Sequence, residues 1–416
     1  MKIINISKEV FDEFSSTHTL RSFYQTSSYA ESFKKDMFDV IYLGGYKDNS
    51  LVAASMILIK SIAFNIKYGY APRGFLIDFY DTSLLREWSE GLKDFFNKKN
   101  IAFIKINPEI TLNIVDYQKE DKFLNVKSNE LVNTLKNFGY EKLKDNMYFE
   151  SQLPKYNPIL DIGEFNLNDV NKIVKNKMNN ISRRGLSIVK GDKYNINAFY
   201  EFIITKNKKP IEFYKKLYDN FENKDMIDLF LVYADYNEYL KSLQIDYTDY
   251  LEENESINHE FSLSPNSKTL FNVKMQSDQH LNELHKEISD VSIKLSNKEQ
   301  KVLIAAALCV KQGKRVNIIE SGFDKEYPKF SPNYYITYKL IEYYKNNGFN
   351  FIDLNGMSGD MSSNNPYKGL NEFKLNFNPT VYEYIGEFDF VLNPTVYQLL
   401  WNTKKLEKEF KDKIAY

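Results

Sequence analysis

The feature that most constrains the fold is a pattern of predicted elements that occurs twice in the 416 residues. In its first occurrence, hairpin-like sequence is followed by a helical stretch at 84–98 and an apolar strand at 101–106. In its second occurrence, a hairpin candidate at 301–319 is followed by a helical stretch at 333–346 and a strand at 349–354. The strands align as FIKIN and FIDLN, which share three of five positions. The repetition predicts a duplicated α/β domain, although two buried strands can also share this much sequence by chance.

The second copy is interrupted at 237–297 by a segment of different character. Apolar residues recur there at spacings of three and four on both sides of Pro265. This heptad spacing predicts two helices that pair antiparallel around the turn and form a coiled-coil arm. Two prolines, Pro154 and Pro158, mark the predicted crossing between the domains. We therefore expect a first domain at 1–153, a second domain in two parts at 154–236 and 298–416, the arm at 237–297, and a closing amphipathic helix at 395–411.

Composition is that of an ordinary globular protein. The formal net charge is −1, so nucleic-acid binding has to come from a local basic patch. Cys309 is the one cysteine of the sequence, which excludes an internal disulfide framework and suits a reducing cytoplasm. No apolar run approaches the ~18 residues of a membrane helix, so any membrane contact is expected to be peripheral. The four histidines lack metal-ligand spacing and no hydrolase or nucleotide-loop motif occurs, so no metal site is expected.

The predicted order of hairpin, helix and strand is typical of acyltransferases with the GNAT fold. A GNAT enzyme that uses acyl-CoA needs a glycine-rich loop between hairpin and helix, where backbone amides approach the pyrophosphate. The corresponding positions are 71–74 (APRG) and 329–332 (KFSP), and neither has several glycines. We therefore expect an α/β (α+β) chain with two tandem GNAT-like acyltransferase domains and no cofactor.

Two short motifs near the C-terminus resemble those of a known family. GLNEFK at 369–374 and YIGEF at 384–388 resemble the C-terminal signature of the FemABX family of non-ribosomal peptidyltransferases. The chain departs from that signature at Asn371, where tyrosine is usual, and at Leu375, where a second lysine is usual. The resemblance extends from residue 25 to residue 394 and is most specific at its C-terminal end. The larger members of the family carry an arm, as is predicted here.

The resemblance implies a reaction and a set of site residues. Members of the family move an amino acid from aminoacyl-tRNA onto a peptidoglycan precursor, and Lys374 takes the place of a lysine near the reacting ester. Asn107 replaces an aspartate common in the family; since an amide cannot act as a base, the acceptor of the amine proton is left open. The substrate-binding residues implied by the resemblance are Lys34, Lys35, Arg73, Asn107, Lys209 and Tyr214.

A basic run at 170–193 contains NISRR at 180–184, which resembles the family's N-K-T-R-R segment. The resemblance implies that Arg183 and Arg184 bind tRNA or precursor phosphates. A solvated helix face is the alternative interpretation of a basic run, because such runs are common on helix surfaces.

The expected function is tRNA-dependent transfer of Gly, Ala or Ser to the stem-peptide side-chain amine of a peptidoglycan precursor, in interpeptide bridge synthesis. The expected partners are aminoacyl-tRNA, a lipid-linked or UDP-linked muropeptide and other aminoacyltransferases, with the enzyme in the cytoplasm or at the inner face of the membrane. Two alternatives stay open. One is a GNAT-type acyl-CoA N-acetyltransferase, which the missing glycines disfavour, and the other is a non-enzymatic tRNA-binding or scaffold protein that uses the arm for assembly.

Overall fold

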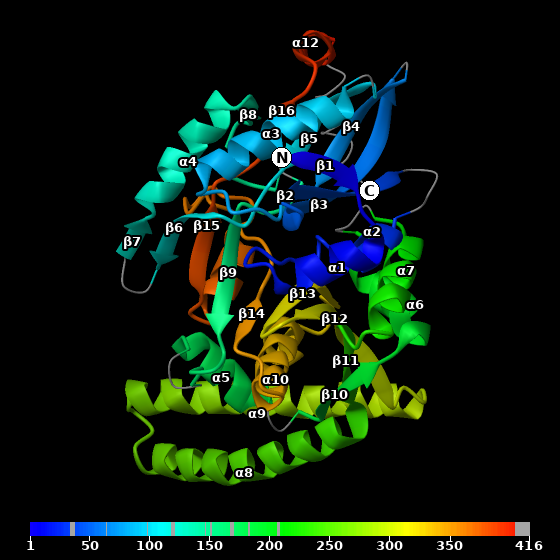
Figure 1. The fold of residues 1–416 in the computed structure, drawn as a ribbon. Helices are drawn as coiled ribbons and strands as arrows, with labels where there is room; N and C mark the ends of the chain where they lie inside the picture. The colour runs from blue at the N-terminus through cyan, green and yellow to red at the C-terminus, as the bar shows by residue number, and fades with distance from the viewer. Residues whose placement is uncertain are drawn as a thin grey trace.

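The computed structural model describes residues 1–33, 38–63, 65–97, 99–117, 121–145, 147–149, 152–166, 170–181, 184–205 and 209–403. These residues form two β-sheets with helices packed against them, and a helical arm extends from the second sheet (Figure 1).

The first sheet has seven strands within the described residues, in the order β1-β2-β3-β4-β5-β16-β8. Neighbouring strands are antiparallel except β4 and β5, which are parallel. The strands are β1 (Lys2–Asn5), β2 (Asp39–Lys47), β3 (Ser50–Ala63), β4 (Ile66–Ala71), β5 (Ile101–Ile106), β8 (Tyr140–Lys142) and β16 (Phe388–Val391). The accompanying helices are α1 (Lys8–Thr17), α2 (Ser27–Glu31), α3 (Thr82–Phe96) and α4 (Val126–Asn137).

The second sheet has nine strands in the described part of the chain, in the order β10-β11-β12-β13-β14-β9-β15-β6-β7. Its one parallel pair among these strands is β13 and β14. The strands are β6 (Thr111–Asp116), β7 (Asp121–Leu124), β9 (Tyr156–Asp161), β10 (Leu186–Gly191), β11 (Ile227–Asp235), β12 (Lys301–Gln312), β13 (Arg315–Phe323), β14 (Phe351–Asp353) and β15 (Thr380–Tyr384). The accompanying helices are α5 (Lys172–Ile181), α6 (Ile196–Ile203), α7 (Ile211–Glu222), α10 (Pro332–Asn346) and α11 (Lys368–Leu375).

The repeat expected from the sequence is present in the strand pairing. In the first sheet, the β3–β4 hairpin is followed by α3 and by β5, which runs parallel to β4. In the second sheet, the β12–β13 hairpin is followed by α10 and by β14, which runs parallel to β13. The helix α3 forms here because Leu85, Trp88 and Leu92, spaced by three and four, are all buried on one face. The predicted fold class, two tandem GNAT-like domains, is confirmed.

The two sheets exchange segments of chain. The hairpin β6–β7 follows β5 directly in sequence, yet it extends the second sheet by pairing with β15. In return, β16 comes from the C-terminal part of the chain and lies between β5 and β8 in the first sheet. The division expected at residue 153 therefore does not coincide with a division between the sheets, because strand pairing over long sequence distances decides which sheet a strand joins.

An apolar core also crosses from one domain to the other. The short helix α2 packs on α7, and the rings of Phe33 and Phe213 lie edge-on with centroids 5.2 Å apart. Phe23 and Phe221 belong to the same buried cluster. Burial of these aromatic side chains holds the two domains together, because each removes a large apolar surface from water.

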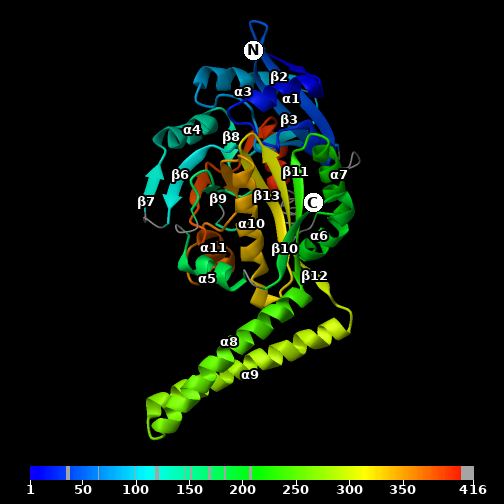
Figure 2. The same ribbon diagram turned by 90° about the horizontal axis from the view of Figure 1, so that it is seen from below.

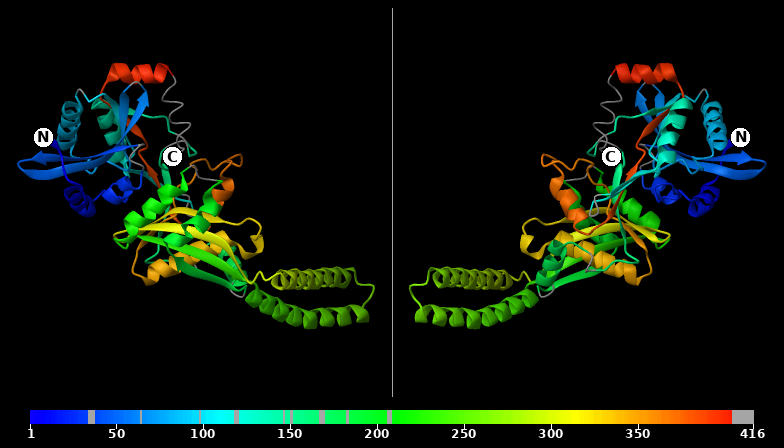
Figure 3. Two further views of the ribbon diagram at one scale, coloured as in Figure 1. Left: turned by 90° about the vertical axis from the view of Figure 1, so that its right-hand side faces the viewer. Right: turned by 90° about the vertical axis from the view of Figure 1, so that its left-hand side faces the viewer.

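The segment between β11 and β12 forms the predicted arm. Helices α8 (Tyr236–Leu263) and α9 (Lys268–Ser296) run antiparallel around a turn and project away from both sheets (Figures 2 and 3). Inside the pair, buried Asn254 donates to Ser277 at 2.8 Å and to Asp278 at 2.9 Å. A buried polar contact of this kind fixes the register of paired helices. The helices that the structure describes include none with the length and apolar composition to cross a membrane.

The chain closes with α12 (Pro394–Asn402). Its buried residues Tyr397 and Leu400 pack on the core of the first domain, where the rings of Tyr397 and Phe103 lie 5.3 Å apart. The helix predicted at 395–411 is thus present as far as residue 402 and packs back on the core; residues 404–411 lie outside the described part of the chain.

Candidate active site

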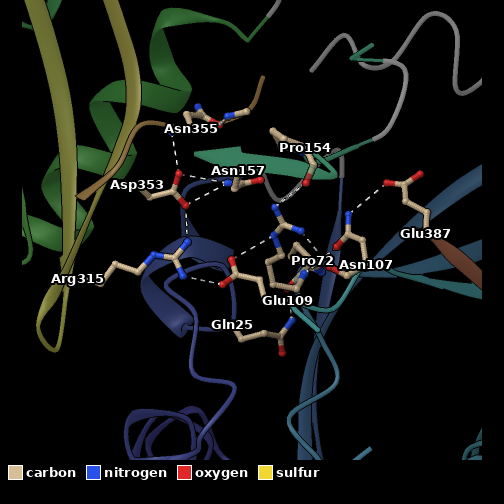
Figure 4. Close-up of polar contacts among 12 residues, drawn as sticks. Gln25, Pro72, Asn107, Glu109, Pro154, Asn157, Arg315, Asp353, Asn355 and Glu387 are labelled. Atoms are coloured by element: carbon tan, nitrogen blue, oxygen red, sulfur yellow. Dashed lines mark hydrogen bonds and ion pairs between the residues drawn. The ribbon is translucent and has the colours of Figure 1, made fainter. Parts of the chain in front are cut away.

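The ends of the equivalent strands β5 and β14 lie on two sides of one polar cluster (Figure 4). Asn107 follows β5 directly, and Asn355 comes two residues after the end of β14. Asn355 has a φ of +64°, a left-handed conformation that asparagine tolerates better than most residues. Loops that leave buried strands are held by a rigid scaffold and are common positions for chemistry.

Four charged side chains join the two strand ends in a series. Arg73 Nε lies 3.3 Å from Glu109 Oε1, and the second oxygen of Glu109 lies 2.9 Å from Arg315 Nη1. Arg315 also binds Asp353 at the end of β14 (Figure 4). Buried charges are tolerated when each has a partner, and breaking such a pair leaves an uncompensated charge. The series therefore fixes how the two strand ends lie relative to one another.

Arg73 and Asn107, both predicted to bind substrate, are held by protein contacts in this structure. The Arg73 backbone N–H donates to Asn107 Oδ1 at 2.8 Å, and Arg73 Nη2 donates to the Pro154 carbonyl at 3.0 Å. Asn107 Nδ2 also donates to Glu387 Oε1 at 3.2 Å, and burial raises the pKa of Glu387. These residues border a cavity of about 20 Å³, which has room for roughly one water molecule. Their contacts position the loop after β4.

Gln25, the residue at which the family resemblance begins, supports that same loop. Its side chain is fully buried and donates to the carbonyls of Pro72 at 2.9 Å and Met56 at 3.1 Å. It also accepts from the Met56 N–H at 2.9 Å. Gln25 thus ties α2 and the start of the chain to the loop that carries Arg73.

Lys374 lies on a helix, which the sequence did not predict. The sequence PYKG at 366–369 is typical of a turn and the Tyr-rich sequence beyond it is typical of a strand, whereas residues 368–375 form α11. Asn371 is buried on this helix; it donates to the Ser358 carbonyl at 2.9 Å and accepts from the Ser358 N–H at 3.0 Å. The residue at which the chain departs from the family signature therefore fastens the loop after β14 to α11.

The ammonium of Lys374 is buried without a directly bound carboxylate among the described residues. It donates to the carbonyl oxygens of Asn355 at 3.1 Å and Gly356 at 2.5 Å, and the residue is 7% exposed. Desolvation lowers the pKa of Lys374 to about 8, although the negative charges of Asp353 and Glu320 act in the opposite direction. A cation of this kind can donate to an oxygen that becomes negative during a reaction.

Gly356 has to be glycine for this loop to reach its position. A Cβ atom there would lie 2.3 Å from Pro154 Cγ, closer than real atoms approach. The carbonyl that accepts from Lys374 is therefore held in place by close backbone packing against Pro154, whose own carbonyl accepts from Arg73.

Lys209 and Tyr214 lie at the start of α7 and face the same region. Tyr214 is buried, and its hydroxyl donates to Glu320 Oε1 at 3.4 Å. Lys209 is partly exposed and its Nζ lies 4.7 Å from the centre of the Phe213 ring. Desolvation lowers the pKa of Lys209, while the charge of Glu320 opposes that shift. Glu320 thus acts electrostatically on both Lys209 and Lys374, and it brings Tyr214 into the same cluster.

The described residues of the basic run lie elsewhere, on α5, at Arg184 and on β10. Arg184 Nη1 donates to the carbonyl of Lys329 at 2.5 Å, close to the root of the arm. Tyr214 contacts Glu320, whose charge acts on Lys374 and Lys209, and Arg73 stands at one end of the series of charges with Asn107 beside it. Lys34, Lys35 and Arg183 lie outside the described residues.

Four charged residues around the site were absent from the sequence-based prediction: Glu109, Arg315, Glu320 and Asp353. Glu109 and Arg315 occur in no motif, and their pairing joins parts of the chain 206 residues apart. Glu387 stands inside the YIGEF motif and was available from the sequence as a candidate.

Two tandem GNAT-like domains are an architecture that acyltransferases use. The family model described as the FemAB family matches residues 6–405, and the chain belongs to that family. It is 22% identical to aminoacyltransferase FemA of Staphylococcus epidermidis over 98% of this chain and 100% of that protein. It is also 22% identical to aminoacyltransferase FemA of Staphylococcus aureus over 92% of this chain and 94% of that protein. A crystal structure of FemX has the same fold, with a TM-score of 0.73 at 20% identity over 96% of this chain and 100% of that one. The chain is an enzyme of the aminoacyltransferase class.

Proposed function

We propose that this enzyme transfers glycine, alanine or serine from aminoacyl-tRNA to the side-chain amine of the stem peptide of a peptidoglycan precursor, in interpeptide bridge synthesis. The observation that carries the proposal is the buried ammonium of Lys374, held by two backbone carbonyls at the mouth between the domains. An ester of tRNA is already activated, so the enzyme has mainly to position the reactants and stabilise the charge that develops.

The chemical step needs no nucleophile from the protein. The lone pair of the acceptor amine forms the new C–N bond at the ester carbonyl, and the carbonyl oxygen becomes negative. Lys374 donates to that oxygen. The bond from the carbonyl carbon to the ribose oxygen then breaks, and the ribose oxygen leaves with the proton that the amine gives up.

Phosphates of the precursor are assigned to the cations near α7. Lys209 lies in this region, and the resemblance places Lys34 and Lys35 with it. A lysine supplies a point charge to phosphate but lacks the bidentate fork of arginine, so more than one lysine is needed for firm binding. The precursor is proposed to be lipid-linked, which would place the enzyme at the inner face of the membrane.

The tRNA is assigned to α5 rather than to the arm. Lys172, Lys175 and Lys177 stand on α5, and this helix carries no acidic residue. The arm at 237–297 has eleven acidic and five basic residues, for a net charge of −6, so it repels a polyanion. The acidic arm is better suited to protein partners, such as other aminoacyltransferases.

The proposal is tested with purified protein, three tRNAs charged with glycine, alanine or serine, and lipid-linked and UDP-linked precursors. Acetyl-CoA with the same precursors tests the alternative of an N-acetyltransferase. Arg184→Glu should weaken tRNA binding and reduce its salt dependence, because fewer counterions are released on binding. Lys241→Glu, on the arm, is the matched control and should change tRNA affinity little. Absence of transfer from all three tRNAs would overturn the proposed activity.

A further inference from the structure

Glu320 stands next to a β-bulge that turns its side chain away from the direction set by the strand. Along β13, Val316 and Ile318 are buried on the side of α10. Leu308 pairs with Glu320 and Cys309 pairs with Ile318, which leaves Ile319 as an extra residue on β13. Without the bulge, alternation would send Glu320 to the same side as Val316 and Ile318. Bulges re-aim side chains and are frequent next to active sites.

The re-aimed carboxylate lies in the cluster that surrounds Lys374. Tyr214 donates to it at 3.4 Å, and its charge acts on both Lys209 and Lys374. Asn355 Nδ2 donates to the Ile319 carbonyl at 2.9 Å, so the bulge is tied to the loop whose carbonyls bind Lys374. Backbone and side-chain contacts thus hold Glu320 and Lys374 in one unit.

Asp353 and Glu109, the two carboxylates of the series of charges, each contact at least one arginine. Asp353 accepts hydrogen bonds from Arg315 and from the Asn355 N–H, and Asn157 Nδ2 donates to both of its carboxylate oxygens. Glu109 lies between two arginines. These two carboxylates serve the series of charges that fixes the two strand ends relative to one another. Asn107, at the end of β5, carries no basic group.

On the basis of the proposed function, we infer that Glu320 accepts the proton of the attacking amine. In the step, the Glu320 carboxylate takes one proton from the amine nitrogen as the C–N bond forms. When the bond between the carbonyl carbon and the ribose oxygen breaks, the Glu320 carboxyl group returns that proton to the ribose oxygen. Glu320 is regenerated as a carboxylate, and no further reactant is consumed.

The surrounding charges favour this transfer. The acceptor is a primary amine that is protonated in water at neutral pH, and it loses this first proton to solvent before it attacks, because Lys374 and Lys209 repel an ammonium and lower its pKa. Glu320 takes the second proton, which the nitrogen gives up as the C–N bond forms. The two side chains thus have different tasks: Lys374 donates to the carbonyl oxygen, and Glu320 accepts a proton from the nitrogen.

The test compares single-turnover transfer by wild type, Glu320→Gln and Glu320→Asp over a range of pH. We expect Glu320→Gln to lower the transfer rate about 10²- to 10⁴-fold and to make the fall in rate at low pH less steep, because only protonation of the acceptor amine then contributes to it, with tRNA affinity and melting temperature unchanged. Glu320→Asp should recover part of the rate. Glu372→Gln, an exposed carboxylate on α11, is the matched control and should behave as wild type.

A second acceptor separates proton transfer from a structural role. Once bonded to the carbonyl carbon, the nitrogen of an aminooxy group is more acidic than that of an alkylamine and gives up its proton to water more readily. A precursor with an aminooxy group in place of the side-chain amine should therefore restore much of the rate of Glu320→Gln. If wild type transfers and Glu320→Gln keeps its rate, or if the aminooxy acceptor gives no recovery, the role of Glu320 is overturned. If wild type itself fails with every charged tRNA, the proposed function is at fault instead.

Discussion

The two domains each contain a buried lysine near the end of the equivalent strand, and the two lysines have different partners. Lys105, on β5, is 1% exposed and its Nζ lies 2.8 Å from Asp389 of β16. Lys374, beside β14, is 7% exposed and is bound by two backbone carbonyls. A carboxylate neutralises the first charge directly, whereas carbonyl dipoles only partly solvate the second.

The difference shows how one kind of side chain serves structure in one domain and chemistry in the other. The Lys105–Asp389 pair joins two strands, and each charge neutralises the other. Lys105 is therefore not available to donate to a reactant. The pKa of Lys374 is lowered to about 8 by desolvation, and its N–H groups face the loop where the domains meet. The partner, rather than the burial, distinguishes the two roles.

The largest effect is expected when the compensated pair is broken. Asp389→Leu leaves Lys105 as an uncompensated buried charge and should lower the free energy of unfolding by about 3–5 kcal/mol. Tyr397 also loses its acceptor in this variant, since its hydroxyl donates to Asp389 at 2.9 Å. Urea denaturation measures the change, and the double variant Lys105→Met/Asp389→Leu should recover most of it. A loss below 1 kcal/mol in the single variant would show that the pair is not structural.

Removal of the second lysine should affect turnover instead of folding. Lys374→Met keeps most of the packing of the stem and removes the charge, so the transfer rate should fall about 10²- to 10³-fold. The melting temperature should change little, because relief of a buried charge offsets the loss of two hydrogen bonds. Lys368→Met, at the exposed start of the same helix, is the control. Near-normal single-turnover transfer by Lys374→Met would make Lys374 a structural residue like Lys105.

The same lysine should add a pH dependence to stability. The pKa of Lys374 is about 8 in the folded chain, below its ordinary value of 10.5, so the unfolded chain binds more protons between these values. The free energy of unfolding should therefore rise with pH across this window, with a slope of up to about 1.4 kcal/mol per pH unit. The measured quantity is the difference between wild type and Lys374→Met at each pH. A difference that is constant from pH 8 upward would contradict the lowered pKa.

The smallest effect is expected from shortening the arm, which should leave the surroundings of both lysines unchanged. Deletion of 251–279 with a short Gly/Ser linker keeps the contact between Tyr250 and His280 and should leave unfolding cooperative. Deletion of 237–297 also removes Tyr239, Leu243 and Val291, which are buried in the second core, and should cost several kcal/mol more. Calorimetry of the two deletions separates the projecting arm from its root. Equal losses would show that the buried residues at the root of the arm add little to the stability of the second core.

The sequence predicted those elements whose local pattern and long-range pairing agree. β5 and β14 were found from FIKIN and FIDLN, and the arm was found from its heptads. The sheet that β16 joins was not predictable, because its apolar pattern fits either sheet and the choice depends on pairing with β5. α11 was missed because Gly369 lowers the helix propensity of a short segment.

The candidate site was also predictable only in part, because one of its residues depends on how two strands pair. Lys374 stood in a recognisable motif, while Glu320 depends on a bulge between β12 and β13. A bulge is a property of hydrogen bonding between two strands, so the sequence of β13 alone does not reveal it. Asn107 was singled out correctly as a position at a strand end, but its present contacts with Arg73 and Glu387 are those of a residue that positions a loop.

The exchange of strands between the sheets has a consequence for biosynthesis. On the ribosome, the first domain emerges before the strand that completes it, because β16 lies between β5 and β8 and is translated after nearly all the rest of the chain. Lys105 likewise waits for Asp389. The N-terminal domain therefore cannot reach its final state during synthesis of the second domain, and nascent chains arrested before residue 388 should remain sensitive to protease within β5. The completion of both domains is tied to the last stage of translation.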